Sequence, residues 1–398
     1  MLVINHTKNI LGLIVICIWV GCNHSPKRNI ILVKNKHGVE RISETVTIPI
    51  AELNMDGLSD SLQWVIKDME TGEYLPCQWV NQNGERTKKV LIFQVNIKPY
   101  SKKNYRLIGQ KAKLYIDTLK RTYSRFVPER IDDYAWENDR VAFRTYGPEG
   151  ERLVKVNEEG GILSSGIDCW LKRVSYPIID KWYKKYSDGN GSYHIDEGEG
   201  LDSYEVNDSR GCGGTGILVN DSLYVSGNFI SYKTLETGPV RTSFELYYAP
   251  WNAAGTIVHE KKVISLDLGS NLAHVEEIFK APFPKNIVAG LAIDQNEGLV
   301  TINEKSGWCS YWNHHEDSEL GVGIVADPKY VTGMTEYRVN KTGHSHLFVH
   351  LKPVNGKIVY YTGFGWKKSG QFESQQQWES YLTEFTTRLV FPLEVEIK

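Results

Sequence analysis

The stretches RTSFELYY, residues 241–248, and KKVISLDL, residues 261–268, decide the class of fold. Both are short and combine alternating polar and apolar positions with β-branched or aromatic residues, which favours β-strands. Turn signals such as Asn83-Gly84 separate other runs of this kind. Comparable runs lie at 30–33, 45–50, 62–66, 89–97, 105–108, 141–146, 222–226, 286–293, 346–351 and 386–395. The chain is therefore predicted to be all-β, with helices limited to short segments near 176–185 and 374–381.

Length and charge limit the classes of function. A chain of 398 residues has room for two domains or for one large β domain. Its 46 basic and 48 acidic residues leave a net charge of −2, which argues against nucleic acid and against a membrane surface as partners. The 11 tryptophans and 22 tyrosines offer flat rings for stacking on sugars, although most of them are expected to fill β cores. Any ligand must therefore be attracted by local groups.

A domain boundary is predicted between residues 110 and 130. The short strands before it suffice for one small β-sandwich, and the aromatic and glycine content rises after it. The basic stretch 111–130 is interpreted as the connection. We expect a signal segment at 1–22, an N-terminal β-sandwich at 23–115, and a larger β domain with the active cleft at 116–398.

The N-terminus predicts export. Lys8 precedes an apolar run, 10–20, that is too short to span a bilayer, and Gly21 stands directly before Cys22. This pattern is typical of a bacterial lipoprotein signal, in which Cys22 is lipidated, although Trp19 stands where leucine is preferred. The alternative is an ordinary cleaved signal. We expect a lipid anchor to be the chain's only membrane attachment, in the outer membrane or periplasm of a Gram-negative bacterium.

The remaining cysteines do not predict a metal centre. Cys77, Cys169, Cys212 and Cys309 lie far apart, and no Cys-x-x-Cys spacing occurs, so a structural zinc site is not expected. An exported protein could join them in disulfides, but the sequence does not decide which pair.

The segment GSYHIDEGEGLDSYEVNDSRGCGG, residues 191–214, is polar and glycine-rich without apolar periodicity. A long loop of this kind in a compact domain is usually functional or disordered. We interpret it as a cleft loop; the alternative is a solvated, calcium-binding or mobile loop. Its acidic residues could hold calcium, but EF-hand spacing is absent, so no cofactor is required and calcium stays open.

The loop carries a chemically complete set for β-elimination from a uronate glycan. Arg210 could neutralise the substrate carboxylate, His194 could remove the C5 proton, and Tyr193 or Tyr204 could protonate the leaving oxygen. The set is not unique. Glu199 and Asp202 could instead serve a glycosidase as a carboxylate pair, and a mutarotase would need only a histidine and a glutamate.

Two histidine clusters compete with this loop. His344, His346 and His350 occupy even-numbered positions, so on a strand they would face one side, as a metal site or a cleft face, although only the closest pair could share one metal ion. His314-His315-Glu316-Asp317 reads mainly as a polar loop, and the alternative is a sugar-binding rim. The predicted substrate-binding residues are Glu199, Asp202, Trp136, Arg144, His344, His346 and Trp366.

Five blocks of sequence resemble an exported bacterial family catalogued as domain of unknown function 4861. They are WENDRVAFRTYGP at 136–148, GLDSY at 200–204, SRGCGG at 209–214, GPVR at 238–241 and YTGFGW at 361–366. The resemblance implies a place beside the glycan-degrading enzymes of Gram-negative bacteria, often those acting on uronic-acid polysaccharides such as pectin. The block GPVR and the run KVISL at 262–266 are also similar to galactose-mutarotase-like β-supersandwiches, a fold that hosts epimerases, hydrolases and lyases.

Three functional classes remain open at this point. The first is a polysaccharide lyase or glycoside hydrolase acting on uronic-acid-containing glycans. The second is a mutarotase-like sugar epimerase, and the third is a non-catalytic glycan-binding surface lipoprotein. In each class the partner is an oligo- or polysaccharide.

Overall fold

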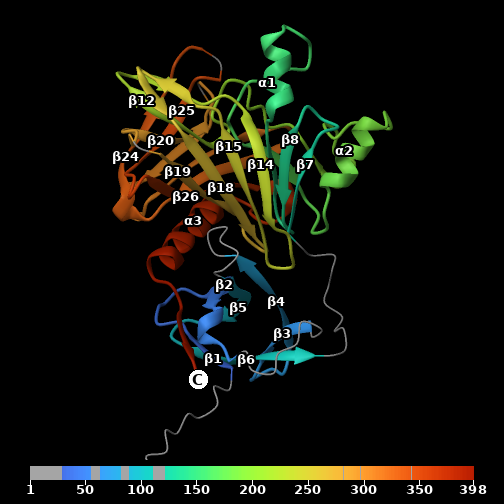
Figure 1. The fold of residues 1–398 in the computed structure, drawn as a ribbon, viewed down its shortest axis with the longest axis vertical. Coiled ribbons are helices and arrows are strands. Elements are labelled where there is room, and N and C mark those ends of the chain that lie inside the picture. Colours follow the sequence, from blue (N-terminus) through green and yellow to red (C-terminus); the bar gives the residue numbers. More distant parts are fainter. Residues whose placement is uncertain are drawn as a thin grey trace, which may run out of the picture.

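The computed structural model describes residues 29–54, 63–81, 89–110, 122–280, 282–295, 297–341 and 343–398. The described residues form antiparallel β-sheets and three α-helices, α1 (Pro148–Lys155), α2 (Ile179–Ser187) and α3 (Gln375–Val390). The all-β prediction is confirmed. Figure 1 shows one sheet unit below a larger one, with α3 beside their junction. The predicted signal segment with Cys22 lies outside the described residues, as does most of the predicted connection at 111–130.

The lower unit is a seven-stranded sheet that folds around its own core. Its strand order is β2 (Arg41–Pro49), β5 (Lys89–Ile97), β4 (Tyr74–Asn81), β3 (Gln63–Asp68), β6 (Lys102–Gln110), β1 (Ile30–Lys34) and β27 (Glu394–Ile397). β4 pairs with β3 through its first half and with β5 through its second, so the sheet bends there. The apolar face buries Ile31, Val33, Ile66, Phe93 and Leu107 in one core.

The chain's last strand belongs to this first sheet. β27 pairs antiparallel with β1, with Ile31 opposite Ile397. The sequence prediction places these residues in the second domain. In the structure the C-terminal segment instead returns to the N-terminal sheet and ties the two units together.

The larger unit is built on an eight-stranded antiparallel sheet. Its order is β14 (Phe229–Glu236), β15 (Arg241–Tyr248), β18 (Glu260–Asp267), β19 (Leu272–Phe279), β26 (Lys357–Trp366), β23 (Ser318–Val325), β22 (Trp308–His315) and β21 (Leu299–Asn303). One face is apolar because alternate residues such as Ile264 and Leu266 point into the core, while Ser265 and Asp267 point to the other face.

Two five-stranded sheets form the second layer on that apolar face. One has the order β13 (Ser222–Tyr224), β12 (Cys212–Val219), β20 (Ile287–Ala292), β25 (His346–Leu351) and β24 (Val331–Tyr337). The other has the order β11 (Gly200–Leu201), β10 (Asp168–Lys172), β9 (Ala142–Thr145), β8 (Asp133–Glu137) and β7 (Tyr123–Val127). A single parallel bridge, Ile167 to Gly211, joins them. Together the layers make the predicted antiparallel β-supersandwich, with a small hairpin, β16 (Trp251–Ala253) and β17 (Thr256–Val258), beside it.

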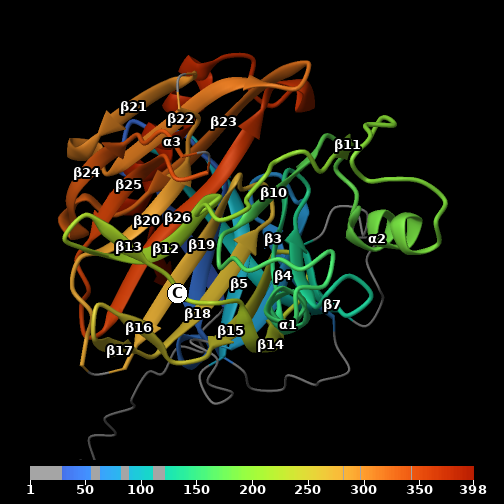
Figure 2. The same ribbon diagram turned by 90° about the horizontal axis from the view of Figure 1, so that it is seen from above.

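Helix α2 lies outside the stack, next to β7, in both views (Figures 1 and 2). Its residues Trp182 and Tyr183 pack on Trp170 of β10, with ring centroids 5.3 and 4.8 Å from that indole. This contact confirms the helix predicted near 176–185. No helix in the described part of the chain is long and apolar enough to cross a membrane.

The predicted strand at 386–395 is wrong. Residues up to Val390 continue helix α3, and only Glu394–Ile397 form a strand. The helix begins at Ser374, whose hydroxyl accepts a hydrogen bond from the amide of Gln377. It extends beyond the predicted 374–381 segment because Trp378, Leu382 and Thr386 recur every four residues and bury one face against β22 and β23.

Candidate functional site

The predicted cleft loop, 191–214, remains mainly a loop in the structure and touches the second layer through two short stretches of strand. Its centre forms β11, and its end begins β12. Its first part lines a small cavity of about 270 Å³ against α2. There Glu199 accepts hydrogen bonds from Lys181 Nζ at 2.6 Å, from Trp182 Nε1 at 3.2 Å, and from the Tyr176 hydroxyl. This carboxylate therefore already has three hydrogen-bond donors within the protein.

Arg144 brings several of the predicted residues together beneath the loop. Its Nε donates to Asp168 at 2.6 Å, its Nη2 donates to Asp202 at 2.8 Å, and its Nη1 lies 3.4 Å from the hydroxyl of Tyr193. Asp133 lies 3.7 Å from Nη1. All five side chains are buried. Three predicted residues, Arg144, Asp202 and Tyr193, thus share one network, but it is closed to solvent.

The electrostatics of this network suit a structural role. Burial raises the pKa of Asp168 well above its usual range, and the neighbouring charge of Asp202 adds to the effect. Burial also raises the pKa of Asp133 to about 6, although the charge of Arg144 opposes the shift. Arg144 thus contacts three buried carboxyl groups, of which Asp133 also lies 3.9 Å from Arg130, and removing Arg144 would leave this buried cluster without its main cation.

The proposed catalytic set for β-elimination is not assembled in the loop. His194 is half-exposed and its Nδ1 lies 2.7 Å from the backbone oxygen of Asp202. Arg210 is 2% exposed and its Nη1 donates to the hydroxyl of Ser165 at 2.9 Å. The hydroxyl of Tyr204 is buried too. Neither Arg210 nor Tyr204 lines either of the two cavities described here.

The other predicted substrate-binding residues are mainly core residues. Trp136 and Trp366 are at most 1% exposed, so a sugar cannot reach either ring in this structure. His346 is buried, and its Nε2 accepts a hydrogen bond from the amide of Arg210 at 3.0 Å. His344 is partly exposed and its Nε2 lies 4.0 Å from Asp208. The predicted alternation of His346 and His350 on one strand is confirmed by β25.

The described residues contain no group of three or more histidine, cysteine, aspartate or glutamate side chains arranged to hold a metal ion. In the loop, Asp196 already pairs with Arg173 at 3.3 Å and with Lys368 at 3.4 Å.

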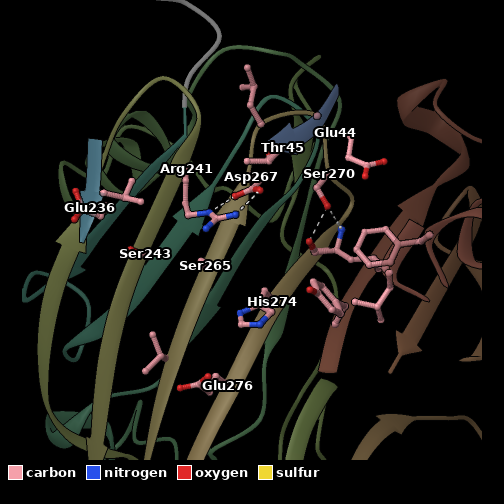
Figure 3. Close-up of a pocket in the computed structure, with 18 of the residues that line it drawn as sticks. Glu44, Thr45, Glu236, Arg241, Ser243, Ser265, Asp267, Ser270, His274 and Glu276 are labelled. Atoms are coloured by element: carbon pink, nitrogen blue, oxygen red, sulfur yellow. Dashed lines mark hydrogen bonds and ion pairs between the residues drawn. The ribbon is translucent and has the colours of Figure 1, made fainter. Parts of the chain in front are cut away.

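The larger of the two cavities is one that the sequence did not predict. It has a volume of about 670 Å³ and lies between the outer face of the eight-stranded sheet, the N-terminal sheet and the end of α3. Figure 3 shows polar side chains from several strands gathered along it. Those used below are Thr45 of β2, Arg241 of β15, Asp267 of β18, His274 of β19 and Tyr361 of β26.

An ion pair stands at the centre of this cleft. Asp267 accepts hydrogen bonds from Nε of Arg241 and, at 2.8 Å, from its Nη2. Burial alone would raise the pKa of Asp267, but the charge and hydrogen bond of Arg241 outweigh burial and lower it. Thr45 of the N-terminal sheet lies beside the same carboxylate and helps to lower its pKa. Within the described residues, Nη1 of Arg241 makes no hydrogen bond, so it is available to a ligand.

His274 and Tyr361 lie beside this pair. Burial, helped by the charge of Arg241, lowers the pKa of His274 to about 4. Burial and the charge of Asp267 raise the pKa of Tyr361 to about 12. The two rings meet edge to face with centroids 5.0 Å apart. At neutral pH the site therefore offers a proton acceptor, the imidazole, next to a proton donor, the phenol.

Two further ion pairs flank the cleft. Lys261 pairs with Glu245 at 2.7 Å, and Lys357 pairs with Glu276 at 3.0 Å. The sequence did carry a signal for this face, because polar residues alternate with the apolar residues of β18 and β19. The alternation alone does not distinguish a cleft from a solvated sheet face.

The chain belongs to the family described as domain of unknown function DUF4861, whose model matches residues 33–395. A relative from Formosa agariphila, described as "Uncharacterized protein P7", is 42% identical over 373 residues, which cover 94% of each chain.

Among solved structures, the chain is similar to two from Enterococcus faecalis. One is described as a protein in glycosyl hydrolase family 38 and the other as an alpha-mannosidase; their TM-scores are 0.48 and 0.47, each at 11% identity. The comparison covers 93% of this chain, but the chain spans about half of those structures, 47% and 46%.

Proposed function

We propose that this protein is an exported carbohydrate-active enzyme that cleaves uronic-acid-containing glycans, such as pectin, by β-elimination in the cleft between the two sheet units. One observation carries the proposal: an uncharged imidazole, a protonated phenol and a guanidinium with an unused edge lie together in an accessible cavity. β-Elimination needs these three groups, because a carboxylate must be neutralised, a carbon acid deprotonated and a leaving oxygen protonated.

Each residue has one task in this reaction. Arg241 binds the uronate carboxylate through Nη1 and stabilises the charge that develops there. His274 removes the proton from C5 while the bond from C4 to the leaving oxygen breaks, and Tyr361 donates its proton to that oxygen. A C4–C5 double bond forms, and the proton on His274 then returns to Tyr361 through solvent, so protons and charge balance.

The low pKa of His274 fits a base whose pKa rises only when the substrate binds. Without a ligand the imidazole is neutral but only weakly basic, because burial and Arg241 disfavour its cation. A bound carboxylate adds a negative charge next to the ring and offsets the charge of Arg241. The pKa of His274 should then rise toward the working pH, where general bases are most effective.

A panel of uronate glycans tests the proposal. We expect incubation with pectic and other uronate polysaccharides to release new reducing ends together with an ultraviolet-absorbing unsaturated uronate. New reducing ends without absorbance would indicate a glycoside hydrolase instead. A change of sugar configuration without cleavage would favour the epimerase, and binding without any turnover would favour a non-catalytic glycan-binding protein.

We further propose that Cys22 carries a lipid anchor. The support is the pattern at residues 8–22 and the net charge of −2, which offers no alternative attraction to membranes or nucleic acid. In cell fractionation, the wild type should sediment with membranes, and Cys22→Ser should be soluble or retained as an unprocessed precursor. A processed Cys22→Ser protein that still sediments with membranes would overturn this assignment.

A further inference from the structure

Gln78 of the N-terminal sheet binds the backbone at Arg241. Its Oε1 accepts hydrogen bonds from the amides of Val240 at 3.1 Å and of Arg241 at 2.9 Å. Its Nε2 donates to the carbonyl oxygen of Arg241 at 2.9 Å. Gln78 is only 8% exposed, so these bonds compete little with water. The side-chain amide thus pairs with Arg241 as a neighbouring strand would.

This contact fills a gap in the sheet. On one side Arg241 lies opposite Asp267 of β18. On the other side the pairing of β14 with β15 ends at Ser243, so β14 does not reach Arg241. The amide and carbonyl groups of Arg241 would therefore lack a strand partner, and Gln78 satisfies both. Gly238 makes the close approach possible, because a Cβ there would lie 2.6 Å from Cδ of Gln78.

The same sheet holds the other half of the ion pair. Thr45 lies beside the carboxylate of Asp267 and helps to lower its pKa. Gln94 donates to the carbonyl oxygen of Leu268, the next residue, at 2.7 Å. The N-terminal sheet therefore contacts both strands that carry the Arg241–Asp267 pair. A domain joined only by a flexible linker would not make these contacts.

We propose that Gln78 is a positioning residue that fixes Arg241 for binding the substrate carboxylate, so that the N-terminal sheet is an integral part of the catalytic site. The inference rests on the proposed function for the role of Arg241. The placement of Arg241 by Gln78 can nevertheless be measured without any substrate.

The pKa of His274 in the full-length protein provides that measurement. Arg241 lowers this pKa, whereas Asp267 and Glu276 raise it. If Gln78→Ala lets the guanidinium move away, its lowering effect is lost while burial and the two carboxylates remain, so the pKa of His274, followed by NMR, should rise by roughly 1 unit. Asn81→Ala is the matched control. Asn81 lies on the same strand and binds Glu236 of β14 at 2.9 Å, so its loss cuts a contact between the same sheets without touching Arg241.

Kinetics on a cleaved uronate glycan form the second readout. Gln78→Ala should lower kcat/KM about 10-fold or more, and Gln78→Glu, which keeps both acceptor bonds, should recover part of that loss. An unchanged His274 titration in a folded Gln78→Ala protein would overturn the inference. If the titration shifts but no uronate glycan is ever cleaved, Gln78 still positions Arg241 and the proposed function is the part that fails.

Discussion

Arg241 and Asp267 lie directly opposite each other on the antiparallel strands β15 and β18, and their side chains form a two-point ion pair facing the cleft. Two parallel hydrogen bonds fix the plane of the guanidinium as well as its position. A ligand carboxylate approaching Nη1 therefore meets a preorganised donor. The pairing of β15 with β18 therefore places the guanidinium for the chemistry that we propose.

Replacing Arg241 with lysine should abolish most activity although it keeps the positive charge. An ammonium group cannot donate to Asp267 at two points and to a substrate carboxylate in the same plane. We expect kcat/KM on a cleaved uronate glycan to fall by about 10² to 10³, the usual loss when one stabilising donor is removed. Lys261→Arg is a control, because it changes the flanking pair with Glu245 but keeps its charge. Equal losses in both variants would contradict a special role for Arg241.

The pH dependence of activity should report His274. Its pKa of about 4 means that the free enzyme holds a neutral base at all higher pH values, so kcat/KM should stay level through neutral pH and fall only near pH 4. His274→Gln should lower kcat by roughly 10² to 10⁴ while glycan affinity changes little.

Protein stability should follow the same titration. The pKa of His274 is lower in the folded chain than the usual 6.5, so protonation favours unfolding, and this contribution to stability is lost as pH falls from 6.5 toward 4. His274→Gln should make unfolding less dependent on pH in that window. A kcat/KM profile with an acid limb near pH 6.5 would contradict the buried, neutral imidazole.

The strands were predictable because their faces alternate. Ile264 and Leu266 are buried between the layers, while Ser265 and Asp267 face the cleft. The sequence shows the same alternation of apolar and polar residues. The run that follows Thr386 looked equally strand-like, since it is short and β-branched. The helical repeat that starts at Trp378 decides its structure, and that repeat becomes visible only when the packing against β22 and β23 is known.

The cleft could not be predicted because its walls are distant in sequence. Thr45, Arg241 and Tyr361 come from β2, β15 and β26, and they meet where the two sheet units pack together. The interpretation of residues 191–214 as a catalytic cleft loop has a related cause. The arginine and tyrosines of this loop are polar in sequence, but Arg210 and Tyr204 bury their polar groups between the layers.

Variants of His194 and Arg144 test whether the active site lies in the cleft or at the loop 191–214. His194 is half-exposed and does not line either cavity, so His194→Ala should leave turnover unchanged if the cleft is the active site. Arg144→Ala should instead destabilise the fold by about 3 to 5 kcal/mol, because it leaves buried carboxyl groups without their cationic partner. Chemical denaturation and glycan turnover measured on both variants check this. A folded His194→Ala protein that loses its activity would move the catalytic site back to the loop.

Glu277 should make the protein less stable at alkaline pH. It lies on the core face of β19 and is 1% exposed; burial raises its pKa to about 8, and the charge of Lys262 only partly opposes the shift. The folded chain therefore holds a proton that the unfolded chain releases near 4.5, the ordinary value. The sign follows from linkage: the contribution is full below 4.5 and is lost as pH rises through about 8.

Glu277→Gln keeps the shape of the protonated acid but cannot ionise. The stability of this variant relative to wild type should increase steadily between about pH 5 and about pH 8 and then level off, as measured by urea unfolding. Glu276→Gln is the matched control, because the neighbouring residue on β19 points to the cleft and pairs with Lys357 instead of entering the core. If Glu277→Gln and wild type keep a constant difference across this range, Glu277 is ionised in the folded core, and the charge of Lys262 then outweighs the cost of its burial.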